Sequence, residues 1–211
     1  MNAASDSLVF FDVDTQVDFI RPTGALYVPG AEQIVPNLER LMNWARVNAI
    51  PVISSADAHT PDDPEFKIWH PHCVIGTAGQ QRIPETLFPE PVVIPCRQGA
   101  FEPPARWEGQ IIVEKPAYSA EDNPNFEAIL QALGRRRAVV FGVATEYCVL
   151  ADVLGLCRRG FKVAVVADAI KPITEEGGRE AMVEMEAAGA RFVTTAEVCN
   201  SAGIMNRVAP S

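Results

Sequence analysis

The sequence predicts a three-layer α/β/α fold with a mostly parallel central sheet. Two features of the chain lead to this prediction. Short, almost continuously apolar runs alternate with longer segments of helical periodicity. Uninterrupted apolar runs are typical of strands that are buried on both faces, as the strands of a parallel sheet are. The helical segments between them would then supply the two outer layers.

Seven apolar runs have the length of a strand, and the expected strands are Leu8–Val13, Ile50–Ser54, Pro91–Ile94, Ile111–Glu114, Ala138–Val143, Phe161–Val166 and Arg191–Val193. The expected helices are Ala31–Asn48, Pro124–Leu133, Thr145–Arg159 and Glu175–Ala188. In the first helix, Ile34, Leu38 and Leu41 recur at spacings of three and four residues, which places them on one face. The proline-rich stretch from Asp57 to Arg106 is expected to be mostly irregular, and loops of this length usually carry function.

Length and composition favour an ordinary globular protein. The 211 residues suit a single domain over 1–211, and 48% of them are hydrophobic against 21% charged. The formal net charge of −9 argues against nucleic acid or an anionic membrane as a partner. The first residues lack the basic segment of a secretion signal, and the five cysteines show no CxxC spacing. We therefore expect reduced thiols and a cytoplasmic location.

Chemically reactive side chains occur where the expected strands end. Asp14 and Asp57 follow the first two strands, Lys115 follows the fourth, and Cys148 lies just past the fifth. In an open parallel sheet, ligands bind beyond the carboxyl ends of the strands, so these side chains are expected at one edge. Each alone could be a helix cap or a solvated turn residue. Lys115 is harder to explain in that way, because the chain has only four lysines and a lysine rarely ends a buried strand without a partner.

Cys148 lies in the first turn of the helix expected after the fifth strand. Unpaired backbone N–H groups and the helix dipole favour the thiolate there, and the thiolate is the nucleophilic form of cysteine. The same N–H groups are suited to hold an oxyanion. Asp14 would take the thiol proton, and the Lys115 ammonium would stabilise both charges. The alternative is that Cys148 is a small buried hydrophobic residue, as most lone cysteines are.

A second group of candidate residues lies in the long loop. Asp57 is followed by His59 and, further on, by His72, and one carboxylate with two imidazoles suits a catalytic divalent metal. Glu65 is a further candidate ligand, whereas His70 is expected not to take part because a proline separates its direction from that of His72. The alternative is that the histidines are surface residues of the loop. Zinc is the first candidate for the metal, with manganese and iron(II) as alternatives.

Several segments form recognisable motifs. Gly142–Val149 reads G-V-A-T-E-Y-C-V, and Asp14–Phe19 fits the pattern D-x-Q-x-D-F. Further segments of the same kind are Gly24–Ala31, Asp57–His59, Pro71–Thr77, and Lys115 with Tyr118-Ser119. Together they resemble the nicotinamidase branch of the isochorismatase-like cysteine hydrolases, over most of the chain. G-V-A-T-E-Y-C-V is the most specific of these motifs and is similar to the family's nucleophile elbow. The resemblance implies an isochorismatase-like, Rossmann-like fold.

The resemblance also implies the roles of individual residues. The catalytic triad would be Asp14, Lys115 and Cys148. A cis peptide bond is implied between Val143 and Ala144, and it would turn the Ala144 N–H towards the same oxyanion as the Cys148 N–H.

The implied activity is metal-assisted hydrolysis of nicotinamide, or of a related small carboxamide, to the acid and ammonia through a thioester. In nicotinamidases the metal holds the pyridine nitrogen, so that the amide carbon faces the thiol. By similarity, Phe19, Trp69 and Tyr118 would form walls around the substrate ring, because aromatic side chains offer flat apolar area at a low entropic cost. Relatives are commonly dimers or tetramers, so we expect a homo-oligomer.

Two parts of the chain depart from the family pattern. Many nicotinamidases have Trp-His-Pro after the first metal aspartate, whereas this chain has Ala58-His59-Thr60-Pro61. The segment Cys96–Gln110 fits no pattern of the family, and a lid or a contact between subunits are the two interpretations of it. Both departures concern the identity of the amide substrate rather than the triad.

Three other functions fit parts of the sequence. Within the same superfamily, the substrate could be a ureido compound or another small amide. Val9–Thr15 also resembles the D-x-D-x-T start of haloacid-dehalogenase-type phosphatases, in which the first aspartate is the nucleophile and magnesium assists, so that Asp12 and Asp14 would carry out phosphoryl transfer. That interpretation needs a later acidic pair for magnesium, of which Asp168 is a single candidate, and it leaves the histidines unexplained. The third is a non-catalytic binding protein, which the presence of all three triad residues disfavours.

Overall fold

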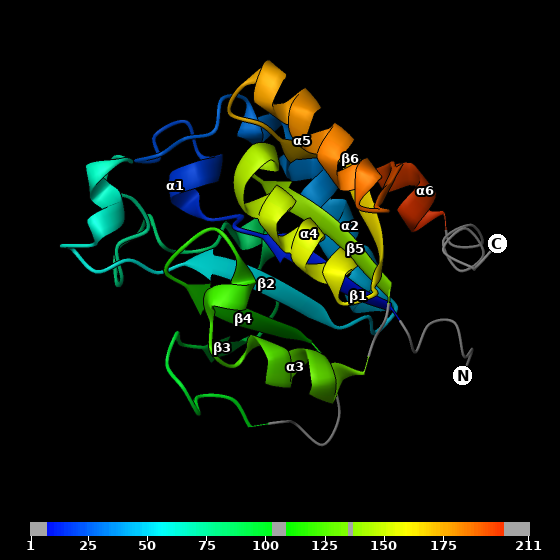
Figure 1. Cartoon of the computed structure of the whole chain (residues 1–211), viewed down its shortest axis with the longest axis horizontal. Helices are drawn as coiled ribbons and strands as arrows, with labels where there is room; N and C mark the ends of the chain where they lie inside the picture. The colour runs from blue at the N-terminus through cyan, green and yellow to red at the C-terminus, as the bar shows by residue number, and fades with distance from the viewer. Residues whose placement is uncertain (1–7, 103–108, 135–136, 201–211) are drawn as a thin grey trace.

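The computed structural model describes residues 8–102, 109–134 and 137–200, and a seven-stranded sheet lies at its centre (Figure 1). The strands are β1 Leu8–Val13, β2 Val52–Asp57, β3 Val92–Ile94, β4 Gln110–Lys115, β5 Arg137–Val143, β6 Lys162–Lys171 and β7 Arg191–Val193. Their order across the sheet is β3-β4-β2-β1-β5-β6-β7, and every neighbouring pair is parallel. The predicted fold class is confirmed, with a sheet that is wholly rather than mostly parallel.

Helices cover both faces of the sheet, as the near-continuous apolar strands predict. The longer ones are α2 Val35–Val47, α3 Phe126–Leu133, α4 Leu150–Arg158 and α5 Glu175–Ala187, and α1 Val17–Ile20 and α6 Thr195–Cys199 are short. Successive residues of β1 point to opposite faces. Phe10 therefore packs in a core with α2 and α6, whereas Phe11 packs in a second core with α3, α4 and α5. Figure 1 shows α4 in front of the sheet and α2 behind it.

The order in which the chain adds strands to the sheet reverses direction at β1. The strands β2, β3 and β4 lie on one side of β1, and β5, β6 and β7 lie on the other. In a doubly wound sheet such a reversal opens a crevice at the carboxyl ends of the strands. At those ends, Val13 is aligned with Ser55 on β2 and with Gly142 on β5, and Asp57 is aligned with Lys115. The topology thus brings residues from four distant segments to one edge.

Some boundaries differ from the predicted ones for local reasons. The helix expected over 31–48 is a 3-10 turn, Ala31–Ile34, followed by α2, because Pro36 lacks the N–H that a continuous helix would need there. The helix α3 begins only at Phe126, since the Asn123 side chain accepts a hydrogen bond from the Asn125 N–H in a turn. The short helix α6 has no counterpart in the prediction. The helix expected over 145–159 begins as a π-helical turn, Thr145–Val149, before α4.

The long segment after β2 is mostly irregular, as predicted, with 3-10 turns at Pro64–Lys67 and Pro84–Thr86. A buried side chain, Arg82, ties it to the sheet. Its guanidinium forms an ion pair with Asp12 and donates hydrogen bonds to Thr15 Oγ1 and, at 2.6 Å, to the Ser55 carbonyl oxygen. Asp12 is 0% exposed and accepts further hydrogen bonds from Thr15 and Ser54. A carboxylate enclosed in this way cannot act as the nucleophile that the phosphatase interpretation requires.

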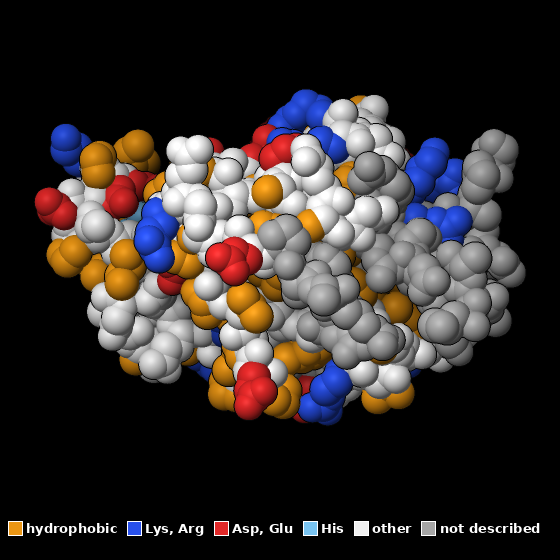
Figure 2. All heavy atoms as spheres, turned by 90° about the horizontal axis from the view of Figure 1, so that it is seen from below, with side chains coloured by type: hydrophobic (Ala, Val, Ile, Leu, Met, Phe, Trp, Pro, Cys, Tyr) orange, Lys and Arg blue, Asp and Glu red, His pale blue; other side chains and the backbone are white. Residues whose placement is uncertain are grey.

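On the face shown in Figure 2, acidic and basic side chains are interspersed, with exposed hydrophobic side chains between them. Among the helices of the described ranges, none has the length and apolar character needed to cross a membrane. Of the segment Cys96–Gln110, residues 103–108 lie outside the described residues. The Ala100 N–H, just before them, donates to Asn125 Oδ1 at 3.1 Å, beside the start of α3.

We predict that Arg82→Ala lowers the free energy of unfolding by about 3–5 kcal/mol, because it leaves the buried Asp12 carboxylate without its partner. Urea denaturation followed by circular dichroism would measure this. The matched control is Arg21→Ala, which removes the partly exposed ion pair with Glu85 and should cost about 0–1 kcal/mol. Equal, small losses in both variants would contradict the prediction.

Candidate active site

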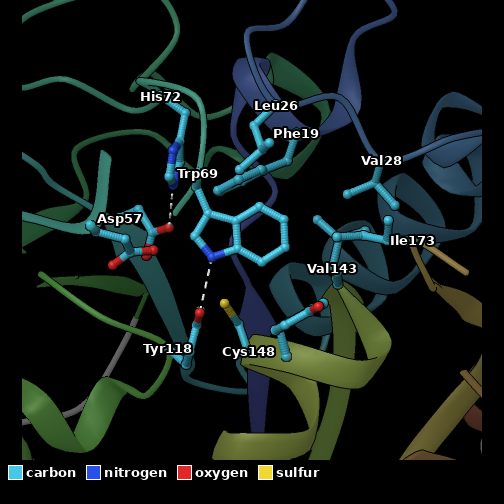
Figure 3. A pocket seen from close by; sticks show the side chains of 13 residues that line it. Phe19, Leu26, Val28, Asp57, Trp69, His72, Tyr118, Val143, Cys148 and Ile173 are labelled. Carbon is cyan, nitrogen blue, oxygen red and sulfur yellow. Dashed lines mark hydrogen bonds and ion pairs between the residues drawn. The ribbon is translucent and has the colours of Figure 1, made fainter. Parts of the chain in front are cut away.

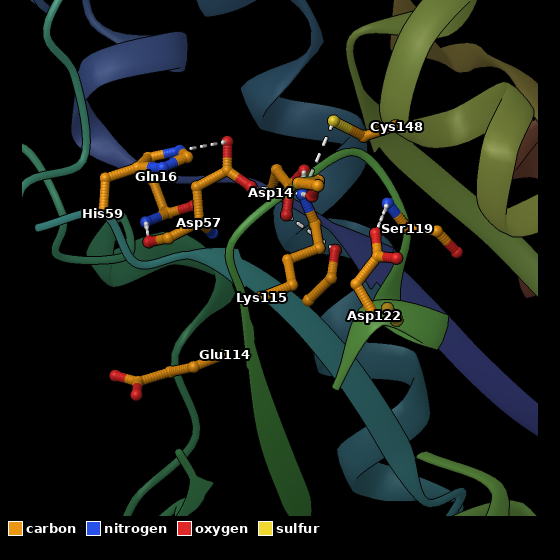
Figure 4. Close-up of polar contacts among 12 residues, drawn as sticks. Asp14, Gln16, Asp57, His59, Glu114, Lys115, Ser119, Asp122 and Cys148 are labelled. Atoms are coloured by element: carbon orange, nitrogen blue, oxygen red, sulfur yellow. Dashed lines mark hydrogen bonds and ion pairs between the residues drawn. The ribbon is translucent and has the colours of Figure 1, made fainter. Parts of the chain in front are cut away.

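The ammonium group of Lys115 is the centre of a buried cluster of charged side chains (Figure 4). Its Nζ lies 2.8 Å from Asp14 Oδ2, and it also forms an ion pair with Asp57 Oδ1. It donates a hydrogen bond to the Ala117 carbonyl oxygen at 2.8 Å and lies 3.6 Å from Cys148 Sγ. The three residues of the predicted triad are therefore neighbours in the structure.

The ends of the strands position these side chains. Asp57 and Lys115 are the last residues of β2 and β4 and lie opposite each other in the sheet, rather than following the strands as predicted. Asp14 directly follows β1 with a φ of 47°, in the left-handed region that non-glycine residues seldom adopt. Its Oδ1 accepts a hydrogen bond from Ser55 Oγ at 2.7 Å, while Oδ2 faces Lys115. The pairing of β2 with β4 thus places the Asp57 carboxylate, and the Ser55 hydroxyl fixes that of Asp14.

The thiol of Cys148 is only 6% exposed, in the π-helical turn that precedes α4. Burial raises its pKa well above the ordinary value; Lys115 opposes this, and Asp14 and Asp57 add to it. The expectation that the helix start would favour a thiolate is therefore wrong for this site, because burial and two carboxylates outweigh it. Nucleophilic attack by Cys148 would need a group that takes the proton.

Asp14 has the properties of that group. Burial raises the pKa of the Asp14 carboxyl above its usual range, although Lys115 opposes the effect. The pKa of Lys115 is also raised: burial would lower it, but Asp14 and Asp57 outweigh that effect. The site thus combines a permanent ammonium with a carboxylate of increased proton affinity, close to a neutral thiol. That is the arrangement that general base catalysis by Asp14 requires.

The backbone at the end of β5 passes very close to β1. Gly142 has a φ of 123°, and a Cβ at this position would lie 2.0 Å from the Val13 carbonyl oxygen, so only glycine fits. The peptide bond between Val143 and Ala144 is cis, as the resemblance predicts. Ala144 and Cys148 both line the pocket described below. Their assignment as the oxyanion hole stays a prediction.

The second oxygen of Asp57 faces two histidines. Asp57 Oδ2 lies 3.6 Å from His59 Nε2 and 3.5 Å from His72 Nε2, and the possible ligand atoms of the three residues all lie within 4.8 Å of one another. His59 Nδ1 is 3.1 Å from Asp63 Oδ2, and His72 Nδ1 is 2.8 Å from the His70 carbonyl oxygen. Both of these partners are hydrogen-bond acceptors, so each Nδ1 carries a proton. In a neutral ring Nε2 then has no proton, and its lone pair is available to a ligand.

This donor set fits a divalent metal ion. His59 Nε2 is buried and has no hydrogen-bond partner among the described residues, which is costly for a polar atom unless a ligand satisfies it. The Asp63 carboxylate, which orients the His59 ring, is a residue that sequence reasoning missed; its only signal was the spacing of four from His59. Glu65 lies in a second group, with His59 and Asp63. The His70 side chain is exposed, and only its carbonyl takes part.

Two further residues of the D-x-Q-x-D-F segment hold the site together. The Gln16 side chain accepts a hydrogen bond from the Asp57 N–H at 2.8 Å and donates to the Asp57 carbonyl oxygen at 2.9 Å. Asp18 Oδ2 accepts from the Cys73 N–H at 2.7 Å, next to His72. Each polar residue of this motif thus supports a different part of the site, a role that the motif alone did not reveal.

A pocket opens between the thiol and the metal-ligand group (Figure 3). Phe19, Trp69 and Tyr118 all line it, as the resemblance implies. Trp69 Nε1 donates a hydrogen bond to the Tyr118 hydroxyl at 2.9 Å, and the Tyr147 ring stacks edge-on against Trp69 with a centroid distance of 5.2 Å. The remaining apolar lining was not predicted and consists of Leu26, Val28, Val143, Tyr147 and Ile173. The pocket between Cys148 and His72 is therefore largely apolar, with aromatic rings in its walls.

Residues 8–197 match the model of the Isochorismatase domain family. The chain belongs to the isochorismatase family of hydrolases. The nicotinamidase of Escherichia coli is 29% identical to it over 204 residues, which cover 88% of this chain and 93% of that protein. A probable inactive nicotinamidase of Arabidopsis thaliana is 24% identical over 195 residues, covering 88% and 91%.

Solved structures of the isochorismatase fold agree with this. The pyrazinamidase of Pyrococcus horikoshii in complex with zinc is 28% identical, with a TM-score of 0.76 over 89% of this chain and 99% of that one. The N-carbamoylsarcosine amidase of Thermoplasma acidophilum is 26% identical, with a TM-score of 0.71 over 90% and 96%. The predicted family is confirmed, and with Asp12 enclosed by Arg82 the phosphatase interpretation is wrong.

We predict that Lys115→Met and Asp14→Asn shift the alkylation of Cys148 in opposite directions along the pH scale. Lys115 lowers the pKa of the thiol and Asp14 raises it, so the midpoint for reaction with iodoacetamide should rise in Lys115→Met and fall in Asp14→Asn, each by about one to three pH units. Mass spectrometry of the peptide that contains Cys148 would measure the rates between pH 6 and 10, where the rate of each variant relative to wild type at the same pH reports the direction of its shift. The exposed Cys96 is the internal control. Shifts in the same direction would contradict this account of the charges.

Proposed function

We propose that the protein is a nicotinamidase-type amidohydrolase, which converts nicotinamide or a closely related small aromatic carboxamide to the acid and ammonia. The observation that carries the proposal is the convergence of Asp14, Lys115 and Cys148 beside the Asp57–His59–His72 group, with Cys148, Asp57 and His72 lining one pocket. The similarity to the Escherichia coli nicotinamidase supports it. A homo-oligomeric, cytoplasmic enzyme remains our expectation.

The first half of the reaction would form a thioester. Asp14 takes the proton of the Cys148 thiol as the sulfur attacks the carboxamide carbon, and the Ala144 and Cys148 N–H groups hold the developing oxyanion. Asp14 then gives its proton to the departing ammonia as the C–N bond breaks. Lys115 stays protonated throughout and stabilises both the carboxylate and the thiolate. In the second half, Asp14 takes a proton from water, which attacks the thioester and releases the acid, and that proton returns to the sulfur.

Asp57, His59 and His72 would hold the metal ion, for which zinc is the first candidate, with Asp63 orienting His59 and Glu65 nearby. The zinc complex of the pyrazinamidase of Pyrococcus horikoshii supports this choice. A bound divalent cation would supply a Lewis acid at the end of the pocket opposite the thiol, suited to a ring nitrogen of the substrate. The chain's own contribution is to engage each Nδ1 with an acceptor and so direct each Nε2 inward.

The charge of the pocket favours a neutral substrate over a ureido acid. No Lys or Arg side chain is among the described residues that line it, and the acidic lining residues are Asp57 and Glu65. A substrate carboxylate, such as that of an N-carbamoyl amino acid, would find no cationic side chain in this lining: Asp57 is paired with Lys115 and assigned to the metal ion, and Glu65 carries the same charge as the substrate. Phe19 and Trp69 offer flat apolar area against which an uncharged ring would pack. We therefore favour nicotinamide over the substrate of the amidase from Thermoplasma acidophilum.

We predict that the purified protein releases ammonia from nicotinamide and that Cys148→Ala lowers kcat by roughly 10⁴-fold or more, because no other group can form the thioester. With N-carbamoylsarcosine, kcat/KM should be lower than with nicotinamide by roughly 100-fold, the cost of an unpaired buried charge. A coupled ammonia assay measures both. Equal or greater activity on the ureido acid would overturn the substrate assignment, and an active Cys148→Ala variant would overturn the mechanism. A wild-type protein inactive on every small amide would favour the non-catalytic alternative.

We predict that the protein binds one divalent ion and that His59→Ala and His72→Ala lose it. Asp63→Ala should weaken metal binding by about 10- to 100-fold, since it releases the orientation of the His59 ring. Titration with a chelator and elemental analysis would measure metal content and affinity. His70→Ala is the matched control in the same loop, because the His70 side chain makes no contribution to the group, and Cys148→Ala should also keep its metal. Full metal content in His59→Ala would contradict the assignment.

A further inference from the structure

Asp152 is a buried acidic residue that neither the motifs nor the proposed mechanism uses. It lies four residues after Cys148, in the first turn of α4, and is 3% exposed. Its Oδ1 accepts hydrogen bonds from Ser119 Oγ at 3.1 Å and from the Ala120 N–H at 2.8 Å. Its Oδ2 is buried and has no hydrogen-bond partner in the described part of the chain. A buried carboxylate with one unsatisfied oxygen is unusual enough to call for a role.

The two hydrogen bonds join the helix of the nucleophile to the loop that follows β4. This loop, residues 116–120, contains two groups of the site. The Ala117 carbonyl oxygen accepts from Lys115 Nζ at 2.8 Å, and Tyr118 lines the pocket and accepts from Trp69. The position of the loop therefore sets both the direction of the ammonium and one wall of the pocket. Asp152 is the side chain of α4 that holds it.

The surroundings of Asp152 favour its uncharged form. Burial raises the pKa of this carboxyl to about 7; Lys115 lowers it, Asp14 raises it, and the hydrogen bonds from Ala120 and Ser119 lower it. The other charged groups near the loop, Glu121 with Arg158 and Arg159, are paired with one another, and Asp122 accepts from the Ser119 N–H. A neutral carboxylic acid still offers a carbonyl oxygen to both donors of the loop. Negative charge is thus unnecessary for the anchor.

We propose that Asp152 is a positioning residue that acts as a hydrogen-bond acceptor and does not need its negative charge, anchoring the 116–120 loop to the nucleophile helix and so orienting Lys115 and Tyr118. The effect on catalysis rests on the proposed function, whereas the anchor itself can be tested without any substrate. This role differs from that of Asp14, which must take up and release a proton. Replacing Asp152 by Asn keeps the acceptor oxygen and should therefore preserve the anchor.

The kinetic test compares Asp152→Asn with Asp152→Ala. The amide keeps the acceptor oxygen, so kcat/KM for nicotinamide should stay within about threefold of wild type. Asp152→Ala releases the loop, and we expect kcat to fall and KM to rise, lowering kcat/KM by roughly 10- to 100-fold. Ser119→Ala, which removes one of the two donors, should lie between them. Asp122→Ala is the control: it weakens the same turn without touching Asp152 and should resemble wild type.

Two measurements test the anchor without substrate. Hydrogen exchange of the Ala120 amide, followed by NMR, should be at least about tenfold faster in Asp152→Ala and nearly unchanged in Asp152→Asn. Because the pKa of Asp152 is raised in the folded state, its contribution to stability is present at low pH and is lost as the pH rises through about 7. Relative to Asp152→Asn, the folding equilibrium constant of the wild type should therefore fall by about tenfold per pH unit between about pH 4, the ordinary pKa of an aspartate, and about pH 7, and should level off above it.

The proposal is overturned if Asp152→Asn loses as much activity and amide protection as Asp152→Ala, since negative charge would then be required. It is equally overturned if Asp152→Ala behaves as wild type, or if the stability difference between wild type and Asp152→Asn does not change with pH. Should Asp152→Ala fail to fold, Asp152→Asn and Ser119→Ala decide the question. Should nicotinamide not be a substrate, the proposed function fails while exchange and stability still decide the anchor.

Discussion

The burial of the Lys115 ammonium is the constraint on which the rest of the site depends. Lys115 is 0% exposed at the end of a central strand, and an ammonium in such a place is tolerated only if opposite charges and hydrogen bonds replace its water. Asp14, Asp57 and the Ala117 carbonyl supply them. To do so, the ends of β1, β2 and β4 and the loop after β4 must converge on one point. The same convergence places the Lys115 ammonium 3.6 Å from Cys148 Sγ.

Asp57 links the two halves of the site through its two oxygens. One oxygen pairs with Lys115, and the other faces His59 and His72. Burial opposes ionisation of this carboxyl, but Lys115 and the two histidines hold its pKa well below the usual range. Asp57 therefore remains a carboxylate, while Asp14, which shares the same ammonium, has a raised pKa. Two aspartates beside one lysine thus acquire different chemistry from their surroundings: one holds charge and the other can carry a proton.

Buried side chains hold the irregular segments of the site in place. Arg82 fastens the long loop to Asp12 and the backbone of β2, Asp18 holds the backbone at Cys73, and Asp152 holds the loop after β4. These contacts are made by ionisable side chains that lie almost fully out of solvent. They position the residues around the substrate pocket on loops whose own backbone forms few regular hydrogen bonds. This explains why so many buried acidic residues surround a site in which we assign base catalysis to only one of them.

The sequence by itself determined the fold class and most of the residues that meet in the site. Apolar runs and helical periods are local properties, so the parallel sheet, its covering helices and the placement of Asp14, Lys115 and Cys148 near strand ends could be predicted from them. The histidine pattern in the loop was likewise visible, as was the motif around Cys148. Some element bounds were nevertheless predicted wrongly. Pro36 interrupts an expected helix, and α6, with 5 residues, is too short to produce a recognisable pattern.

Only the tertiary structure decided the charge states and the supporting contacts. The neutral thiol of Cys148, the contacts of Asp57 with both Lys115 and the histidines, and the hydrogen bonds of Asp152 to the loop after β4 depend on residues that are far apart in the chain. Asp63 is only four residues from His59, but the spacing alone did not show that its carboxylate meets the ring. A pKa depends on the water removed and on the charges brought near, and neither is a property of a sequence segment. The removal of water and the approach of other charges are both set only when the strands on either side of β1 come together in the sheet. For this reason the residues of the site could be read in advance, but not their state of protonation.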